Sequence, residues 1–140
     1  DVVKSKAAEQ DIIIMTAAVA DFCPSHPADE KIKKNDSSYE AVIELERTED
    51  ILSYLGAHKA KGQLICGFSM ETQNMLENSK AKLAKKNADM IVANNLKVAG
   101  AGFGTDTNVV TLITADDCTE LEIMDKSCVA ARIMDRLLQM

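Results

Sequence analysis

The chain has 140 residues, of which 46% are hydrophobic and 27% charged, and its formal net charge is −6. This length suffices for one domain with a sizeable hydrophobic core, and we expect residues 1–140 to form a single domain. The acidic charge argues against general nucleic-acid binding. No apolar run reaches the roughly 18 residues of a membrane helix, so we expect no membrane partner. The four cysteines are widely spaced, which is typical of reduced thiols in a cytoplasmic protein.

Strand and helix patterns alternate along the chain. The expected strands cover residues 11–15, 41–46, 63–68, 89–93, 109–113 and 120–123. The expected helices are the second half of one over residues 1–10, one that Thr48 caps and that ends before Gly62, one over 74–87 and one over 126–138.

The hydrophobic pattern decides these assignments. Three strands are short continuous apolar runs, which are typical of buried strands in a parallel sheet. The strand at 41–46 alternates apolar and polar residues, which indicates an edge or half-buried strand. In the last helix, Val129, Ile133 and Leu137 form one apolar face. The alternation predicts an α/β fold: a three-layer Rossmann-like sheet, mostly parallel, with a C-terminal β-hairpin and a final helix.

The first candidate site is the segment 16–34, which follows the first buried strand. It contains small residues, then the carboxylate of Asp21, and then Lys31, Lys33 and Lys34. In open α/β sheets, ligands bind outside the carboxyl ends of the strands. A loop of this composition there can hold a polyphosphate and its metal. A solvated loop that happens to be basic explains the composition equally well.

The helix at 74–87 carries a second group of cations. Leu76 and Leu83 lie two turns apart and are expected to face the core, whereas Lys82 and Lys86 are four residues apart and project from one face. Like charges at that spacing destabilise an isolated helix by about 0.2–0.5 kcal/mol, and an anionic ligand would remove that cost. The alternative is a solvated helix face.

Two further features each have a functional and a structural interpretation. Phe68 ends a buried strand at the same edge of the sheet as Asp21, where an aromatic ring can stack on a base or cover the core. Gly100, Gly102 and Gly104 precede a strand, whereas the dinucleotide fingerprint precedes a helix. We therefore expect tight turns there, and the pattern counts against a nicotinamide-dependent enzyme. No Ser-His-Asp or Cys-His arrangement is visible, which favours a site that acts by positioning and charge neutralisation in nucleotidyl or phosphoryl transfer.

Several motifs occur together in the order of one known family. They are AAVADF (17–22), KIKK (31–34), T-x-DIL (48–52), GFSMET (67–72), the lysine-rich stretch at 79–86, D-x-IVAN (89–94) and F-x-x-D-x-N (103–108). Together they resemble bacterial phosphopantothenoylcysteine synthetase, a ligase of coenzyme A biosynthesis. In many bacteria this synthetase is the C-terminal half of a fused protein whose other half is an FMN-dependent decarboxylase.

The resemblance implies a two-step reaction. The carboxylate of 4′-phosphopantothenate attacks the α-phosphate of CTP, giving an acyl-cytidylate and pyrophosphate. The amine of L-cysteine then attacks the acyl group, giving 4′-phosphopantothenoyl-L-cysteine and CMP. The family also implies a homodimer, and Mg²⁺ in the first step. The alternative is a non-catalytic nucleotide-binding or dimerisation module of a larger protein.

The resemblance also implies roles for particular residues. Lys31 and Asp21 would be catalytic, with Lys31 on the triphosphate and Asp21 as a ligand or indirect partner of Mg²⁺. The implied nucleotide site comprises Met15, Thr16, Ala17, Asp21, Lys31, Glu49, Asp50, Ile51, Leu52, Phe68, Lys82 and Lys86.

The chain departs from the family pattern in three respects. Glu49 stands where several relatives carry proline, and GFSMET (67–72) replaces the GFAAET of other members. The family's domain also opens with a strand, a glycine-rich loop and an asparagine, none of which precedes residues 1–10. We therefore expect a truncated synthetase domain with little or no ligase activity on its own.

Overall fold

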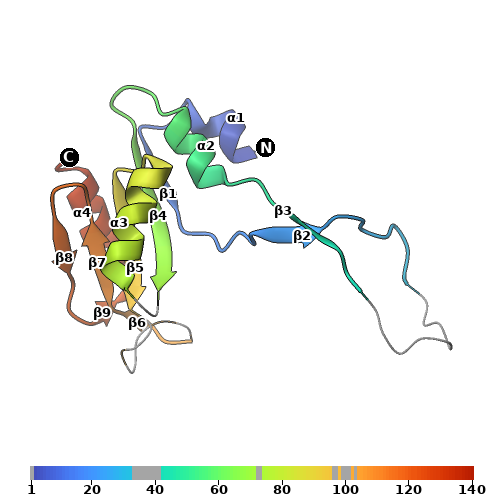
Figure 1. Ribbon diagram of the computed structural model, residues 1–140. Helices are drawn as coiled ribbons and strands as arrows, with labels where there is room; N and C mark the ends of the chain where they lie inside the picture. The colour runs from blue at the N-terminus through green and yellow to red at the C-terminus, as the bar shows by residue number, and fades with distance from the viewer. Residues whose placement is uncertain (1, 33–41, 72–73, 96–97, 99–101, 103) are drawn as a thin grey trace. The chain divides into compact units, whose positions relative to one another are not determined.

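The structure is a computed structural model that describes residues 2–32, 42–71, 74–95, 98, 102 and 104–140. The chain divides into two compact units. The larger one, here called the sheet unit, comprises Asp1–Thr16 and Ile51–Met140, and the smaller one, here called the insert, is Ala17–Asp50 (Figure 1). The sheet unit is therefore discontinuous in sequence, and the single domain expected from the chain length stays a prediction.

A five-stranded sheet forms the centre of the sheet unit, in the order β1-β4-β5-β7-β8. The strands are β1 (Ile12–Met15), β4 (Leu64–Glu71), β5 (Met90–Asn95), β7 (Val110–Ile113) and β8 (Cys118–Glu120). The neighbours β1, β4 and β5 are parallel, whereas β7 is antiparallel to both β5 and β8. The expected α/β fold with a C-terminal hairpin is confirmed. Its sheet is mixed, because the first three strands in the order are parallel and the last two are added in antiparallel fashion.

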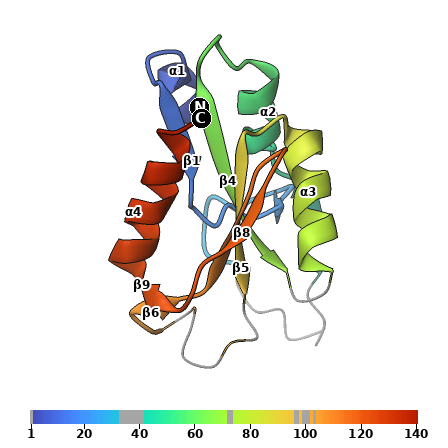
Figure 2. The ribbon, with the colours of Figure 1, turned by 90° about the vertical axis from the view of Figure 1, so that its left-hand side faces the viewer.

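Helices cover both faces of this sheet (Figure 2). The helices α2 (Ile51–Ala57) and α3 (Met75–Lys86) lie on one face, and α4 (Lys126–Leu137) lies on the other. Because successive strand residues point to opposite faces, alternate residues of β4, β5 and β7 meet α4. The resulting hydrophobic core contains Cys66, Met90, Val92, Val110, Leu112, Val129, Ile133 and Leu137. The apolar face predicted for the last helix is thus confirmed.

The short helix α1 (Val2–Ala7) is fastened to the chain just before β4 by one side chain. Gln63 is buried, and its Nε2 donates hydrogen bonds to the carbonyl oxygens of Ala7 at 2.7 Å and Gln10 at 2.6 Å. The end of α1 is therefore held beside the first residues of β1 and β4. Within the described part of the chain, no helix has the length and apolarity that crossing a membrane requires.

Three sequence-based expectations are wrong in detail. Leu76 is 45% exposed, because the buried face of α3 is formed by Ser79 and Leu83 instead. The strand expected at 41–46 is found as β3 (Leu45–Arg47), an exposed strand that pairs with β2 (Phe22–Pro24) within the insert. An alternating pattern shows that one face is apolar but not which surface covers it. The third error is Thr48, because α2 begins only at Ile51.

The glycine pattern has the conformation expected of turns. Gly102 and Gly104 have φ values of 105° and 72°, which favour glycine, and Gly100 lies outside the described residues. The strand that follows, β6 (Thr107–Asn108), pairs with β9 (Met124–Asp125) just before α4. The glycines are therefore followed by a strand, whereas a dinucleotide-binding fingerprint would be followed by a helix.

Cys66 gives the core a measurable pH dependence. Burial, reinforced by the negative charge of Asp89, raises the pKa of its thiol from 9.0 to about 12. Above pH 9 the unfolded thiol loses its proton while the folded thiol keeps it, so the free energy of unfolding falls between pH 9 and 12. We expect Cys66→Val to reduce this decline by up to about 1.4 kcal/mol per pH unit, measured by urea unfolding at pH values from about 8 to 11.

The matched control is Ile65→Val, which alters the same strand without a titratable group. It should lower stability at every pH and keep the wild-type slope. Equal slopes for Cys66→Val and the wild type would show that the thiol does not cause the decline.

Candidate functional site

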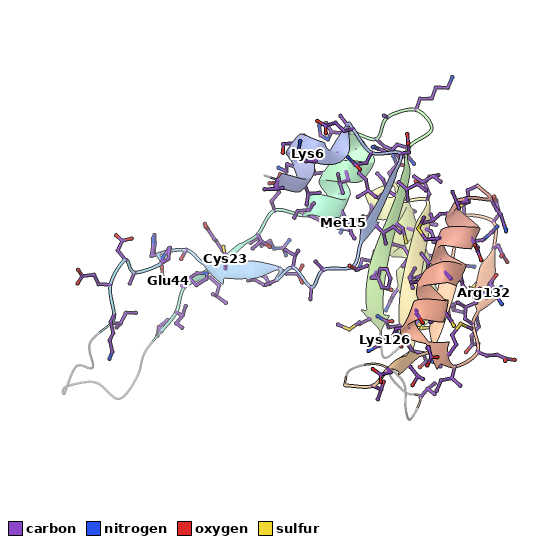
Figure 3. All side chains as sticks on the ribbon, turned by 180° about the vertical axis from the view of Figure 1, so that it is seen from behind. Lys6, Met15, Cys23, Glu44, Lys126 and Arg132 are labelled. Atoms are coloured by element: carbon purple, nitrogen blue, oxygen red, sulfur yellow. The ribbon has the colours of Figure 1, made fainter. Side chains whose placement is uncertain are left out.

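The carboxyl end of β1 and the middle of β4 bring together several residues of the predicted nucleotide site. The expectation that Phe68 ends its strand is wrong, because β4 continues to Glu71. Met15, at the end of β1 (Figure 3), is the register partner of Gly67 in β4, which precedes Phe68. A Cβ atom at Gly67 would lie 2.6 Å from Leu52 Cδ2 and 3.1 Å from Ile91 Cδ1. The missing side chain therefore lets the first turn of α2 pack directly on β4.

Two lysines of α3 are held by hydrogen bonds to the neighbouring elements β4 and α2. Lys82 Nζ donates a hydrogen bond to the carbonyl oxygen of Phe68 at 3.0 Å, and Lys86 Nζ donates one to Ser53 Oγ of α2 at 3.0 Å. Both lysines are half-buried, whereas the other two lysines of α3 are exposed. We predicted these two lysines as site residues from their spacing. In the structure they differ from the other two lysines of α3 in being half-buried, and each donates a hydrogen bond to another element.

Phe68 contributes its side chain to the core and its carbonyl oxygen to the candidate site. Its side chain is half-buried and packs against the hydrophobic core, while its carbonyl oxygen holds Lys82. The interpretation that the ring covers the core is thus confirmed. Stacking of the exposed part of the ring on a base stays a prediction.

The insert carries Asp21 and Lys31, which are both exposed. Within the insert, the carbonyl oxygen of Asp21 accepts a hydrogen bond from the backbone N–H of Thr48 at 3.0 Å, and the Thr48 hydroxyl donates to the carbonyl of Ala20. Thr48 therefore ties the two segments of the insert together, and its predicted role as a helix cap is wrong. The remaining predicted site residues of the insert are Ala17, Glu49 and Asp50, which are exposed as well.

The Mg²⁺ prediction depends on Asp21. Among the residues that the structure describes, no three His, Cys, Asp or Glu side chains gather into a group that could hold a metal ion. One exposed carboxylate nevertheless suits Mg²⁺, which keeps several waters and takes substrate phosphates as its other ligands. The donor set fits that mode of binding, and the assignment stays a prediction.

Three hydroxyl groups in this region were not foreseen. Ser53 holds Lys86, and Ser69 Oγ of β4 lies 2.9 Å from Ser79 Oγ of α3 in a buried contact. Serine has no diagnostic spacing, so the sequence gives almost no signal for such contacts. The one hint is that Ser69 lies in the GFSMET motif, where other family members have GFAAET.

The chain is similar to known proteins over its whole length. Residues 1–140 match a family model described as the DNA/pantothenate metabolism flavoprotein C-terminal domain. The coenzyme A biosynthesis bifunctional protein CoaBC of Bacillus subtilis is 48% identical over 128 residues, which cover 91% of this chain and 31% of that protein. A crystal structure of the C-terminal domain of a CoaBC protein matches with a TM-score of 0.76 and 40% identity, covering 99% of this chain and 60% of that one.

A further relative has a different name. A cysteine/cysteine sulfinic acid decarboxylase from an unknown prokaryotic organism is 47% identical over 131 residues, which cover 93% of this chain and 36% of that protein. The chain spans about a third of the length of both curated relatives. The similarity therefore concerns one shared region of proteins whose named activities differ.

Proposed function

Because the chain belongs to the family of DNA/pantothenate metabolism flavoprotein C-terminal domains, we propose that it carries the synthetase step of coenzyme A biosynthesis. The predicted resemblance to the synthetase domain of CoaBC is confirmed by the matches to that protein and to its C-terminal domain. In the proposed reaction, 4′-phosphopantothenate and L-cysteine are joined while CTP is cleaved to CMP and pyrophosphate. The CTP requirement and the acyl-cytidylate intermediate are part of this proposal.

One observation carries the proposal: two cations of α3 are held by hydrogen bonds on the face of the sheet that α2 and α3 cover. The ammonium groups of Lys82 and Lys86 are hydrogen-bonded at 3.0 Å to Phe68 of β4 and Ser53 of α2. Phe68 directly follows Gly67, the register partner of the last residue of β1, and open α/β sheets bind ligands at such strand ends. A lysine ammonium has three donors, so each lysine can keep this bond and still donate to a phosphate.

The proposed chemistry requires charge neutralisation and positioning. When the phosphopantothenate carboxylate attacks the α-phosphate of CTP, the bond to the β-phosphate breaks and pyrophosphate leaves with the negative charge. Lys82 and Lys86 would stabilise that charge, and Lys31 would contact the triphosphate. Mg²⁺, when bound by Asp21 and the phosphates, supplies further charge neutralisation. In the second step, the amine of L-cysteine attacks the acyl carbon and CMP leaves.

Calorimetric titration of the chain with CTP and with ATP, both with Mg²⁺, tests the nucleotide part of the proposal. We expect CTP to bind about tenfold or more tightly than ATP, a difference of about 1.4 kcal/mol. Lys31→Gln should weaken CTP binding about tenfold, because it removes a charge-assisted contact from an exposed position. The control is Lys61→Gln, also exposed, which should bind CTP like the wild type.

Two outcomes would contradict the proposal. Equal affinity for CTP and ATP would remove the preference for CTP. An absence of nucleotide binding would favour the alternative of a dimerisation module. A homodimer is itself a compatible proposal, and the exposed apolar side chains of Phe22, Ile43 and Leu45 in the insert support it.

A further inference from the structure

Ser69 and Ser79 form a buried hydrogen bond between β4 and α3. Their Oγ atoms are 2.9 Å apart, and the two residues are 3% and 0% exposed. A buried hydroxyl without a partner is costly, so each serine holds the other in place. The bond therefore joins one point of the helix to one point of the strand.

A second bond joins the same two segments one turn further along the helix. Ser69 directly follows Phe68, whose carbonyl oxygen accepts the hydrogen bond from Lys82, and Lys82 lies three residues after Ser79. Residues three apart lie on neighbouring positions of a helix surface. A rotation or shift of α3 that breaks the serine bond must therefore also move the stem of Lys82 away from Phe68.

The geometry points to a positioning role: we propose that the Ser69–Ser79 pair fixes the rotation and height of α3 on β4, so that the Lys82 ammonium is held beside Phe68, level with the carboxyl end of β1, and is presented there to the phosphates of a nucleotide. This inference rests on the proposed function. It assigns to two uncharged side chains part of the affinity for the triphosphate, through a third residue.

Preorganisation is the physical reason for the effect. A lysine side chain has many rotamers, and a ligand that must order it binds less tightly. The bond to Phe68 orders Lys82 before the ligand arrives. Hydrophobic packing of α3 comes from Leu83, which is buried one turn beyond Ser79. Removing one hydroxyl should therefore leave the helix in the fold and loosen only its register on the strand.

The test measures CTP binding of the full chain by calorimetry, in Ser79→Ala, in Ser69→Ala and in a Lys82→Met background. We expect each serine variant to bind CTP about three- to tenfold more weakly. In the Lys82→Met background, Ser79→Ala should cause no further loss, because the serine acts through the lysine. If Ser79→Ala fails to fold, Ser69→Ala still tests the inference. Alanine is expected to be tolerated at position 69, because it is the third residue of the GFAAET pattern of other family members.

The control is Thr114→Val, which removes another buried hydroxyl, one bonded to Asp117 in the hairpin. It should lower the free energy of unfolding and leave CTP affinity unchanged. CTP affinities of both serine variants within about twofold of the wild type would overturn the inference. Losses that add fully to that of Lys82→Met would overturn it as well, because they would show an effect that does not pass through the lysine.

A measurement without nucleotide separates this inference from the proposed function. In NMR spectra of lysine NH₃⁺ groups, the hydrogen-bonded Lys82 ammonium should give a resolved signal in the wild type that is lost or shifted in Ser79→Ala. If this change occurs but the wild type does not bind CTP, the proposed function fails and the positioning of Lys82 stands. An unchanged signal overturns the positioning whatever the chain binds.

Discussion

Gly56→Ala is expected to lower the free energy of unfolding by about 3 kcal/mol or more, because it forces two packed helices apart. A Cβ atom at Gly56 in α2 would lie 1.8 Å from the carbonyl oxygen of Lys86 and 2.9 Å from its carbonyl carbon. Both are backbone atoms, so no side-chain rotation relieves the clash. The hydrogen bond from Asn87 Nδ2 to the carbonyl oxygen of Gly56, 2.7 Å long, would be disturbed as well.

Urea unfolding followed by circular dichroism measures this effect, with Gly62→Ala as the matched control. Gly62 has φ of 84°, and no heavy atom of the described residues lies within 4 Å of the position that a Cβ atom would take there. Its replacement should therefore cost only the strain of a left-handed alanine, about 1–2 kcal/mol. If Gly56→Ala were no more costly than Gly62→Ala, α2 and α3 would not be in the close contact that the structure shows.

Asp89→Ala is expected to destabilise the chain by about 2–3 kcal/mol, because it leaves two partners unsatisfied. Oδ1 of Asp89 accepts a hydrogen bond from Lys59 Nζ at 2.8 Å, and Oδ2 accepts one from the backbone N–H of Ile65 at 2.7 Å. The side chains of the ion pair are only 22% and 18% exposed. The carboxylate thereby fixes the start of β5 against the start of β4.

The control for Asp89 is an ion pair on the surface. Arg136 and Asp117 lie 3.5 Å apart with side chains that are 31% and 50% exposed. Arg136→Ala should therefore cost much less than Asp89→Ala in the same urea experiment. Equal costs for Asp89→Ala and Arg136→Ala would show that the Lys59–Asp89 pair is no better shielded from water than the surface pair.

The order and type of the main elements could be predicted because their signals are local. The apolar runs that became β1, β4 and β5, and the spacing of Val129, Ile133 and Leu137, depend only on neighbouring residues. Leu76 was misplaced because the rotation of α3 is set by its contact with the sheet. The placement of β3 depends likewise on its partner β2, which lies far away in the sequence.

The candidate site could be predicted in part for the same reason. The spacing of Lys82 and Lys86 is a local signal that places both on one face of the helix, whereas the contact of Lys82 with Phe68 follows from the packing of α3 on β4. The hydroxyl contacts of Ser53, Ser69 and Ser79 depend on distances of about 3 Å between elements. No pattern along the chain encodes such distances. The lysines could therefore be predicted from the sequence, whereas the serine hydroxyl groups that help to position them could not.

The discontinuity of the sheet unit has a consequence for the order of folding. In the part of the chain that the structure describes, the edge strand β1 pairs only with β4, and the whole insert Ala17–Asp50 separates it from the rest of the sheet unit. Pairing β1 with β4 must therefore close a long loop, and closing a loop costs more entropy the longer it is. The strands and helices after the insert are joined by shorter segments, so their pairing costs less entropy. We expect α1 and β1 to join the sheet last and to detach first. The hydrogen bonds of Gln63 to Ala7 and Gln10 then form in that late step and hold α1 and β1 against the start of β4.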